Sequence, residues 1–185
     1  MEFKKNLVLC TAGETLKGRL LKKLVANYGY WLGGFFTEEL RAGSAREGFL
    51  LRTPRGGSEL LASVKMVSAV SFNKYGVAPG TLDGFAVRSL LEARKEKKII
   101  LMDELGPLTL GSDKLAAGAL SALGSDSPCL ATYRRGAGKF EEEFRRMGNT
   151  LVAGLRADTF AETEALAAGW IEFWMKKMES TDDLR

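Results

Sequence analysis

The sequence predicts an α/β protein with a mainly parallel central sheet, helices on both of its faces and one inserted β-hairpin. Three observations lead to this prediction. Short apolar runs alternate with helical stretches along the 185 residues. Residues 99–102 form a continuous apolar run, as expected of a strand that is covered on both faces. Apolar runs at 47–53 and 58–64 flank a Pro-x-Gly-Gly turn, a pattern typical of a hairpin.

The remaining elements are predicted in chain order from the spacing of apolar residues. The first strand is expected at 7–10, and the helix after it carries Leu20, Leu21, Leu24 and Val25 on one face. A second strand follows at 30–36, then a polar turn at 37–45, and a loop is expected at 71–80. Further helices are predicted between Thr81 and Lys98, at 113–123, at 139–147 and from about 159–161 onward, with strands at 99–102, 128–133 and 150–155.

Composition favours one cytoplasmic domain spanning residues 1–185. The longest apolar runs are far shorter than the ~20 residues that span a bilayer, and the N-terminus does not resemble a signal peptide. Cys10 and Cys129 lie in predicted strands and are expected to be reduced core thiols. The net charge of +4 comes from scattered residues, which permits a nucleotide ligand but does not predict a nucleic-acid partner. Because histidine is absent, catalysis would depend on carboxylates, lysine, arginine or backbone amides.

The N-terminal strand, loop and helix have the order of a phosphate-binding P-loop, with altered key residues. The pattern G-x-x-x-x-G-K-[ST], placed on Lys17, meets Thr11, Leu16 and Gly18 at its glycine, glycine and hydroxyl positions. Lys17 is then the candidate that neutralises phosphate. The residues expected to surround the phosphates are Thr11, Ala12, Gly13, Glu14, Thr15, Leu16, Lys17, Gly18 and Arg19.

A second acidic element follows the apolar strand at 99–102. Asp103 stands at the strand end, where a carboxylate can hold Mg²⁺ through water. Glu104 comes next, where a carboxylate can orient or deprotonate an attacking water. Since ligands bind outside the carboxyl ends of parallel strands, this pair and the loop at 11–18 are expected at the same edge of the sheet.

Five segments together give the chain a specific resemblance. They are LLKKL at 20–24, GFFTEELR at 34–41, GFLLRT at 48–53, KYGV at 74–77 and IILMDELG at 99–106. In this order and spacing, the chain resembles the small THEP-type nucleoside-triphosphatases. The resemblance covers most of the chain. It implies a RecA-like P-loop core, which is a three-layer sandwich. It also implies that the protein hydrolyses ATP, GTP and other nucleotides with Mg²⁺. It also aligns Lys17 with the P-loop lysine of the family.

The departures from the family pattern concern the phosphate loop. The family has glycines where this chain has Thr11 and Leu16, and these glycines let the backbone turn its N–H groups onto phosphate. Leu16 in a left-handed conformation would cost on the order of 1 kcal/mol or more, and its side chain either blocks the phosphate site or turns away from it. Gly18 supplies no hydroxyl for Mg²⁺.

Other residues have two interpretations each. A rival register that starts at Gly13 places Arg19 at the lysine position, but it shifts the helix against the family pattern. Glu38 and Glu39 follow the second strand, either near the nucleotide or in a solvated turn. Arg134 and Arg135 follow the strand at 128–133, where one of them can act as an arginine finger or both can be surface residues.

Three functions remain open from the sequence. The first is a divergent member that binds nucleotide through Lys17 and Asp103 and hydrolyses it weakly or not at all. The second is an active Mg-dependent nucleoside-triphosphatase in which Lys17 and Glu104 are catalytic. The third is a scaffold for a protein partner, with no nucleotide. A protein partner or a homo-oligomer is compatible with all three.

Overall fold

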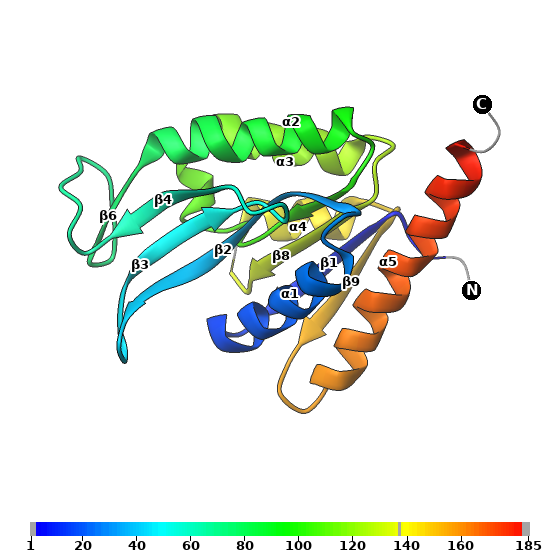
Figure 1. Cartoon of the computed structure of the whole chain (residues 1–185), viewed down its shortest axis with the longest axis horizontal. Helices are drawn as coiled ribbons and strands as arrows, with labels where there is room; N and C mark the ends of the chain where they lie inside the picture. Colours follow the sequence, from blue (N-terminus) through cyan, green and yellow to red (C-terminus); the bar gives the residue numbers. More distant parts are fainter. Residues whose placement is uncertain (1–2, 137, 183–185) are drawn as a thin grey trace.

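The computed structural model describes residues 3–136 and 138–182, and it has one mixed sheet between two layers of helices (Figure 1). Five parallel strands form the centre in the order β2-β7-β8-β1-β9. Their bounds are β1 Asn6–Thr11, β2 Leu32–Ala42, β7 Ile99–Met102, β8 Cys129–Arg134 and β9 Thr150–Leu155. The predicted α/β class with a mainly parallel sheet is therefore confirmed.

The helices cover both faces of this sheet because strand side chains alternate between them. Leu7 and Leu9 of β1 face one apolar cluster, whereas Val8 faces the other. Helices α1 (Glu14–Tyr28) and α5 (Phe160–Asp182) lie on the first side. On the second side lie α2 (Val87–Lys95), α3 (Asp113–Gly124) and α4 (Lys139–Arg146). Two short helices, η1 (Thr81–Ala86) and η2 (Thr109–Gly111), precede α2 and α3.

The inserted hairpin is confirmed and is part of a larger antiparallel extension. Strands β3 (Ala45–Arg52) and β4 (Ser58–Ser63) form the predicted hairpin. The segment 71–80, expected to be a loop, contains a second small hairpin of β5 (Ser71–Phe72) and β6 (Tyr75–Val77). The extension continues the sheet in the order β5-β6-β4-β3-β2.

Strand β2 belongs to both parts of the sheet, and the predicted polar turn at 37–45 is wrong. Leu32–Phe35 of β2 pair in parallel with β7, and from Phe36 to Ala42 the same strand pairs antiparallel with β3. Polar residues are compatible with this second half, because an antiparallel sheet can have one face in water. Gly34 has a φ of +84° and packs so closely on β7 that a Cβ would lie 2.2 Å from the Leu101 carbonyl oxygen.

Both cysteines carry free thiols, as expected. Cys129 is fully buried, and burial raises the pKa of its thiol to about 12. Cys10 is half-buried. In the part of the chain that the structure describes, no helix has the length and apolar character needed to cross a bilayer.

Candidate nucleotide site

Asp103 lies immediately after β7, and its fully buried carboxylate is fixed by both neighbouring strands. Thr37 of β2 donates to Oδ2 from its backbone N–H (2.8 Å) and from its hydroxyl (2.5 Å). Thr132 of β8 donates to Oδ1 at 2.5 Å. Lys17 Nζ completes the set at 3.2 Å from Oδ2. Because these partners come from three elements, the orientation of the Asp103 carboxylate depends on the register of the sheet.

Glu104 turns away from the strand in a left-handed conformation with a φ of 59°. Its backbone N–H donates to the Thr132 hydroxyl at 2.9 Å. Its carboxylate accepts from Lys17 at 2.5 Å and forms an ion pair with Arg134 at 3.3 Å. Burial raises the pKa of Glu104; the charge of Lys17 opposes this shift, and the neighbouring carboxylates of Glu14 and Asp103 add to it.

Lys17 is the centre of the site. Its side chain is 1% exposed although it carries an ammonium group. Besides Asp103 and Glu104, its Nζ contacts Glu14 at 3.0 Å and donates to the Thr37 hydroxyl at 3.1 Å. Burial alone would lower the pKa of Lys17, but the three carboxylates outweigh burial and raise it. Lys17 is therefore a buried, charged lysine.

Arg134 closes a ring of alternating charges. It contacts Glu14 at 2.5 Å and Glu104 at 3.3 Å, and these are two of the three carboxylates that Lys17 contacts. We call Lys17, Glu14, Asp103, Glu104 and Arg134 the Lys17 cluster. The cluster holds two positive and three negative charges, so its formal net charge is −1.

The predicted phosphate loop is much shorter than expected, because α1 starts at Glu14. Only Ala12 and Gly13 separate this helix from β1. An acidic residue is favourable in the first turn of a helix, and the sequence around Lys17 lacks the two glycines that would keep the backbone open. Residues 14–18 are consequently helical, which leaves no extended loop to wrap a phosphate.

Of the nine residues predicted to surround phosphate, Glu14 and Lys17 reach the cluster. Thr11 is buried and donates to the Tyr133 carbonyl at 3.3 Å. Of the two positions open to Leu16, the structure shows the one turned away from the phosphate site, since Leu16 is helical and packs on the apolar cluster of α1 and α5. The rival register is also not supported, because the Arg19 guanidinium stacks 4.4 Å from the ring centre of Phe160.

The other candidates divide between the cluster and the surface. Arg134 joins the Lys17 cluster, whereas Arg135 is exposed. Glu38 pairs with Lys22 and Arg52, at 3.0 and 2.5 Å. Glu39 pairs with arginines of β2 and β3, at 2.6 Å from Arg41 and 2.9 Å from Arg46. Both glutamates lie within β2, where the predicted turn would have been.

Thr37 and Thr132 are site residues that the sequence pattern did not predict. Thr37 lies in β2 just beyond its parallel pairing with β7, Thr132 lies near the carboxyl end of β8, and each donates to Asp103. Isolated threonines in β-rich segments are common, so their residue type carried no signal. Knowledge of the strand order β2-β7-β8 would have placed both next to Asp103.

The raised pKa of Glu104 predicts a pH dependence of stability. A carboxyl group whose pKa is higher in the folded state makes a contribution to stability that is lost as pH rises from its ordinary value of 4.5 through the folded value. The melting temperature of the wild type, measured relative to that of Glu104→Gln, should therefore fall as pH rises from acid to neutral. Glu38→Gln is the control of opposite sign, because hydrogen bonding by Arg52 lowers the pKa of Glu38. Melting curves across this pH range measure both, and a parallel trend in the two variants would contradict the assignment.

Comparison with known proteins identifies the family of this chain. The model of a family described as NTPase matches residues 7–157. The chain belongs to this NTPase family. It is 31% identical over 140 residues to the nucleoside-triphosphatase THEP1 of Thermotoga maritima, which covers 76% of this chain and 78% of the relative. The THEP1 of Methanocaldococcus jannaschii is 29% identical over 159 residues, which covers 78% of this chain and 94% of the relative.

The fold agrees with this NTPase assignment. The crystal structure of THEP1 from the hyperthermophile Aquifex aeolicus superimposes with a TM-score of 0.74 at 25% identity, over 83% of this chain and 91% of that one. The predicted resemblance to the THEP-type nucleoside-triphosphatases is thus confirmed, and so is the P-loop fold.

NTPases of this kind usually use a divalent metal with the nucleotide, but the Lys17 cluster as arranged does not fit one. The carboxylates of Asp103, Glu104 and Glu14 are hard oxygen ligands of the type Mg²⁺ prefers. However, the Lys17 ammonium already lies between them, at 2.5 to 3.2 Å. Gly18 provides no hydroxyl beside them.

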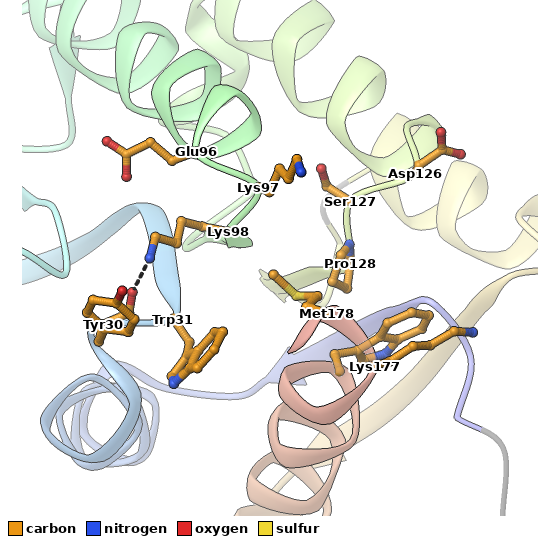
Figure 2. A pocket seen from close by; sticks show the side chains of 11 residues that line it. Tyr30, Trp31, Glu96, Lys97, Lys98, Asp126, Ser127, Pro128, Lys177 and Met178 are labelled. Carbon is orange, nitrogen blue, oxygen red and sulfur yellow. Dashed lines mark hydrogen bonds between the residues drawn. The ribbon is translucent and has the colours of Figure 1, made fainter. Parts of the chain in front are cut away.

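A large cavity lies at the opposite edge of the NTPase sheet (Figure 2). Its volume is about 570 Å³, and it is lined by residues that precede β2, β7 and β8 and by the end of α5. Lys98 donates to the Tyr30 carbonyl at 2.7 Å beside it, as Figure 2 shows. Ligands of parallel α/β sheets bind outside the carboxyl ends of the strands, whereas this cavity lies at their amino ends.

Proposed function

We propose that the protein binds a nucleoside triphosphate at the Lys17 cluster and hydrolyses it weakly or not at all. The observation that carries this proposal is that Lys17 contacts three carboxylates while α1 starts at Glu14. A triphosphate that approaches Lys17 meets a net negative cluster and must displace Glu14. It also meets a helical turn instead of an open loop of backbone N–H groups.

In this proposal each residue keeps a defined role. Lys17 and Arg134 neutralise phosphate charge, and the first turn of α1 around Glu14 borders the phosphates. Asp103 would hold the Mg²⁺ that accompanies the nucleotide only if Lys17 left its carboxylate, because the ammonium occupies that position in the cluster as arranged. Glu104 orients the attacking water to the extent that hydrolysis occurs. A cytoplasmic location belongs to the same proposal.

An active nucleoside-triphosphatase is the second candidate. It is favoured by Asp103 and Glu104 at the end of β7, both in contact with Lys17. In this alternative, Lys17 would leave the carboxylates and bind phosphate when nucleotide enters. The scaffold function would hold if no nucleotide binds at all.

Two measurements separate these functions. Thermal denaturation with Mg-ATP or Mg-GTP should show stabilisation of about 2.7 kcal/mol at a ligand concentration of 100 Kd. Phosphate release should stay near the background of buffer without enzyme. Release well above background that disappears in Glu104→Ala, but not in the exposed control Glu142→Ala of α4, would establish the active enzyme instead. No stabilisation by any nucleotide would overturn the proposed binding and leave the scaffold function.

A further inference from the structure

A second cavity of about 420 Å³ lies between the start of α1 and the antiparallel extension. It is beside the Lys17 cluster, because two members of the cluster line it. Its volume is within the range of small-molecule sites. The residues that carry the argument are Glu14 and Arg134 on the side of the cluster and Arg46, Phe49, Phe72 and Tyr75 on the side of the extension.

The extension side of this cavity is an aromatic wall with a fixed guanidinium. Phe49 and Tyr75 pack edge to face, with ring centres 5.3 Å apart. The Arg46 guanidinium lies 5.1 Å from the centre of the Phe49 ring and 5.9 Å from that of Tyr75. It is held by the Tyr75 hydroxyl at 3.0 Å and by Glu39 at 2.9 Å. Flat guanidinium and phenyl surfaces of this kind stack on planar heterocycles.

The aromatic residues also complete the small core of the extension, so packing alone has to be considered. Tyr75 is nearly fully buried and fits that explanation. Phe49 and Phe72 are only half-buried, and they line a cavity instead of filling it. Packing of the extension does not require the open space between these rings and Glu14.

The charges of the cavity suit an anionic ligand with a planar part. Arg41, Arg46 and Arg134 line it together with Glu14 and Glu39, which leaves an excess of one positive charge. Arg134 also contacts Glu104 of the Lys17 cluster. A ligand with phosphates at Lys17 can therefore extend past Arg134 into the aromatic part.

We propose that this cavity binds the nucleobase of the nucleotide, with the base stacked on Phe72 and on the Phe49–Arg46 surface. The inference rests on the proposed function, because it takes a nucleotide as the ligand of the Lys17 cluster. It adds that the antiparallel extension recognises the base, and that the parallel core holds the phosphates.

Titration calorimetry with Mg-ATP, Mg-GTP and Mg-tripolyphosphate tests this inference. Tripolyphosphate has the phosphates but no base. In the wild type, at least one nucleotide should bind about tenfold more tightly than tripolyphosphate, and Phe72→Ala should remove this advantage. Phe72→Leu keeps most of the apolar volume without a ring face, and should give the same loss if Phe72→Ala does not fold. Tyr30→Ala at the opposite edge is the control, because it removes an aromatic side chain from a residue that is 71% exposed.

The outcomes separate the two proposals. If tripolyphosphate and the nucleotides bind the wild type with equal affinity, or if the Phe72 variants keep the nucleotide advantage, the base site is overturned and nucleotide binding at the Lys17 cluster stands. If neither nucleotide nor tripolyphosphate binds, the proposed function fails and the base site fails with it. An equal loss in Tyr30→Ala also overturns the base site.

Discussion

Lys17→Met should lower the free energy of unfolding by about 3–5 kcal/mol, the usual effect of removing one partner from a buried ion pair. Methionine preserves much of the aliphatic length of Lys17, so the cavity term is small. What is lost is the ammonium, which lies within 3.2 Å of three carboxylates. Asp103 then remains fully buried with its charge opposed only by hydroxyl and backbone donors.

Chemical denaturation at neutral pH measures this effect. Lys22→Met is the matched control, since Lys22 is on the same helix and pairs with Glu38, but its side chain is 66% exposed. An exposed pair contributes about 0–1 kcal/mol. If Lys17→Met costs as little as Lys22→Met, the Lys17 cluster does not hold the fold together. The double variant Lys17→Met/Glu104→Gln should recover part of the loss, because it removes one of the three carboxylates that no longer face the Lys17 charge.

Glu14→Gln should raise the affinity for tripolyphosphate at least about tenfold, which corresponds to 1.4 kcal/mol. The Glu14 carboxylate contacts both Lys17 and Arg134, the two cations that the proposed site offers to phosphate. Glutamine keeps the size of the side chain and removes the competing charge. A first-turn acidic residue also stabilises its helix, so the variant should lose about 0.3–1 kcal/mol of stability.

Titration calorimetry at low salt measures the gain, and the gain should shrink as salt screens the charges. Glu38→Gln makes the same charge change on β2, outside the Lys17 cluster, and should change the affinity much less. Equal gains in the two variants would mean that overall charge, and not Glu14, limits anion binding. A weaker affinity in Glu14→Gln would show that Glu14 supports the ligand instead of competing with it.

The central fold was predictable because its signals are local. The apolar run of β7 and the alternation of strands and helices are encoded by neighbouring residues, and they fixed the class of the sheet. The second half of β2 was not predictable in this way. Its Thr-Glu-Glu sequence resembles a solvated turn, and it becomes a strand because β3 pairs with it.

The site residues also divide into those indicated by neighbouring residues in the sequence and those that depend on the pairing of strands. Lys17, Asp103 and Glu104 were found from a motif and a strand end, and the structure brings them into contact. The start of α1 at Glu14 depends on residues that departed from the motif, so the motif could not predict the helical turn. Thr37 and Thr132 became visible only through the order of strands in the sheet.

Strand β2 has a consequence for how members of this fold can vary in length. Its 11 residues run without a break from the parallel core, past Thr37, into the extension. An insertion at the exposed turn after Ala42 lengthens the extension and leaves Thr37 beside Asp103. A single residue inserted between Leu32 and Thr37 reverses the side-chain alternation and moves the Thr37 hydroxyl to the other face of the sheet. Length variation is thus expected at the tip of β2, and a fixed count of residues is expected between its first residue and Thr37.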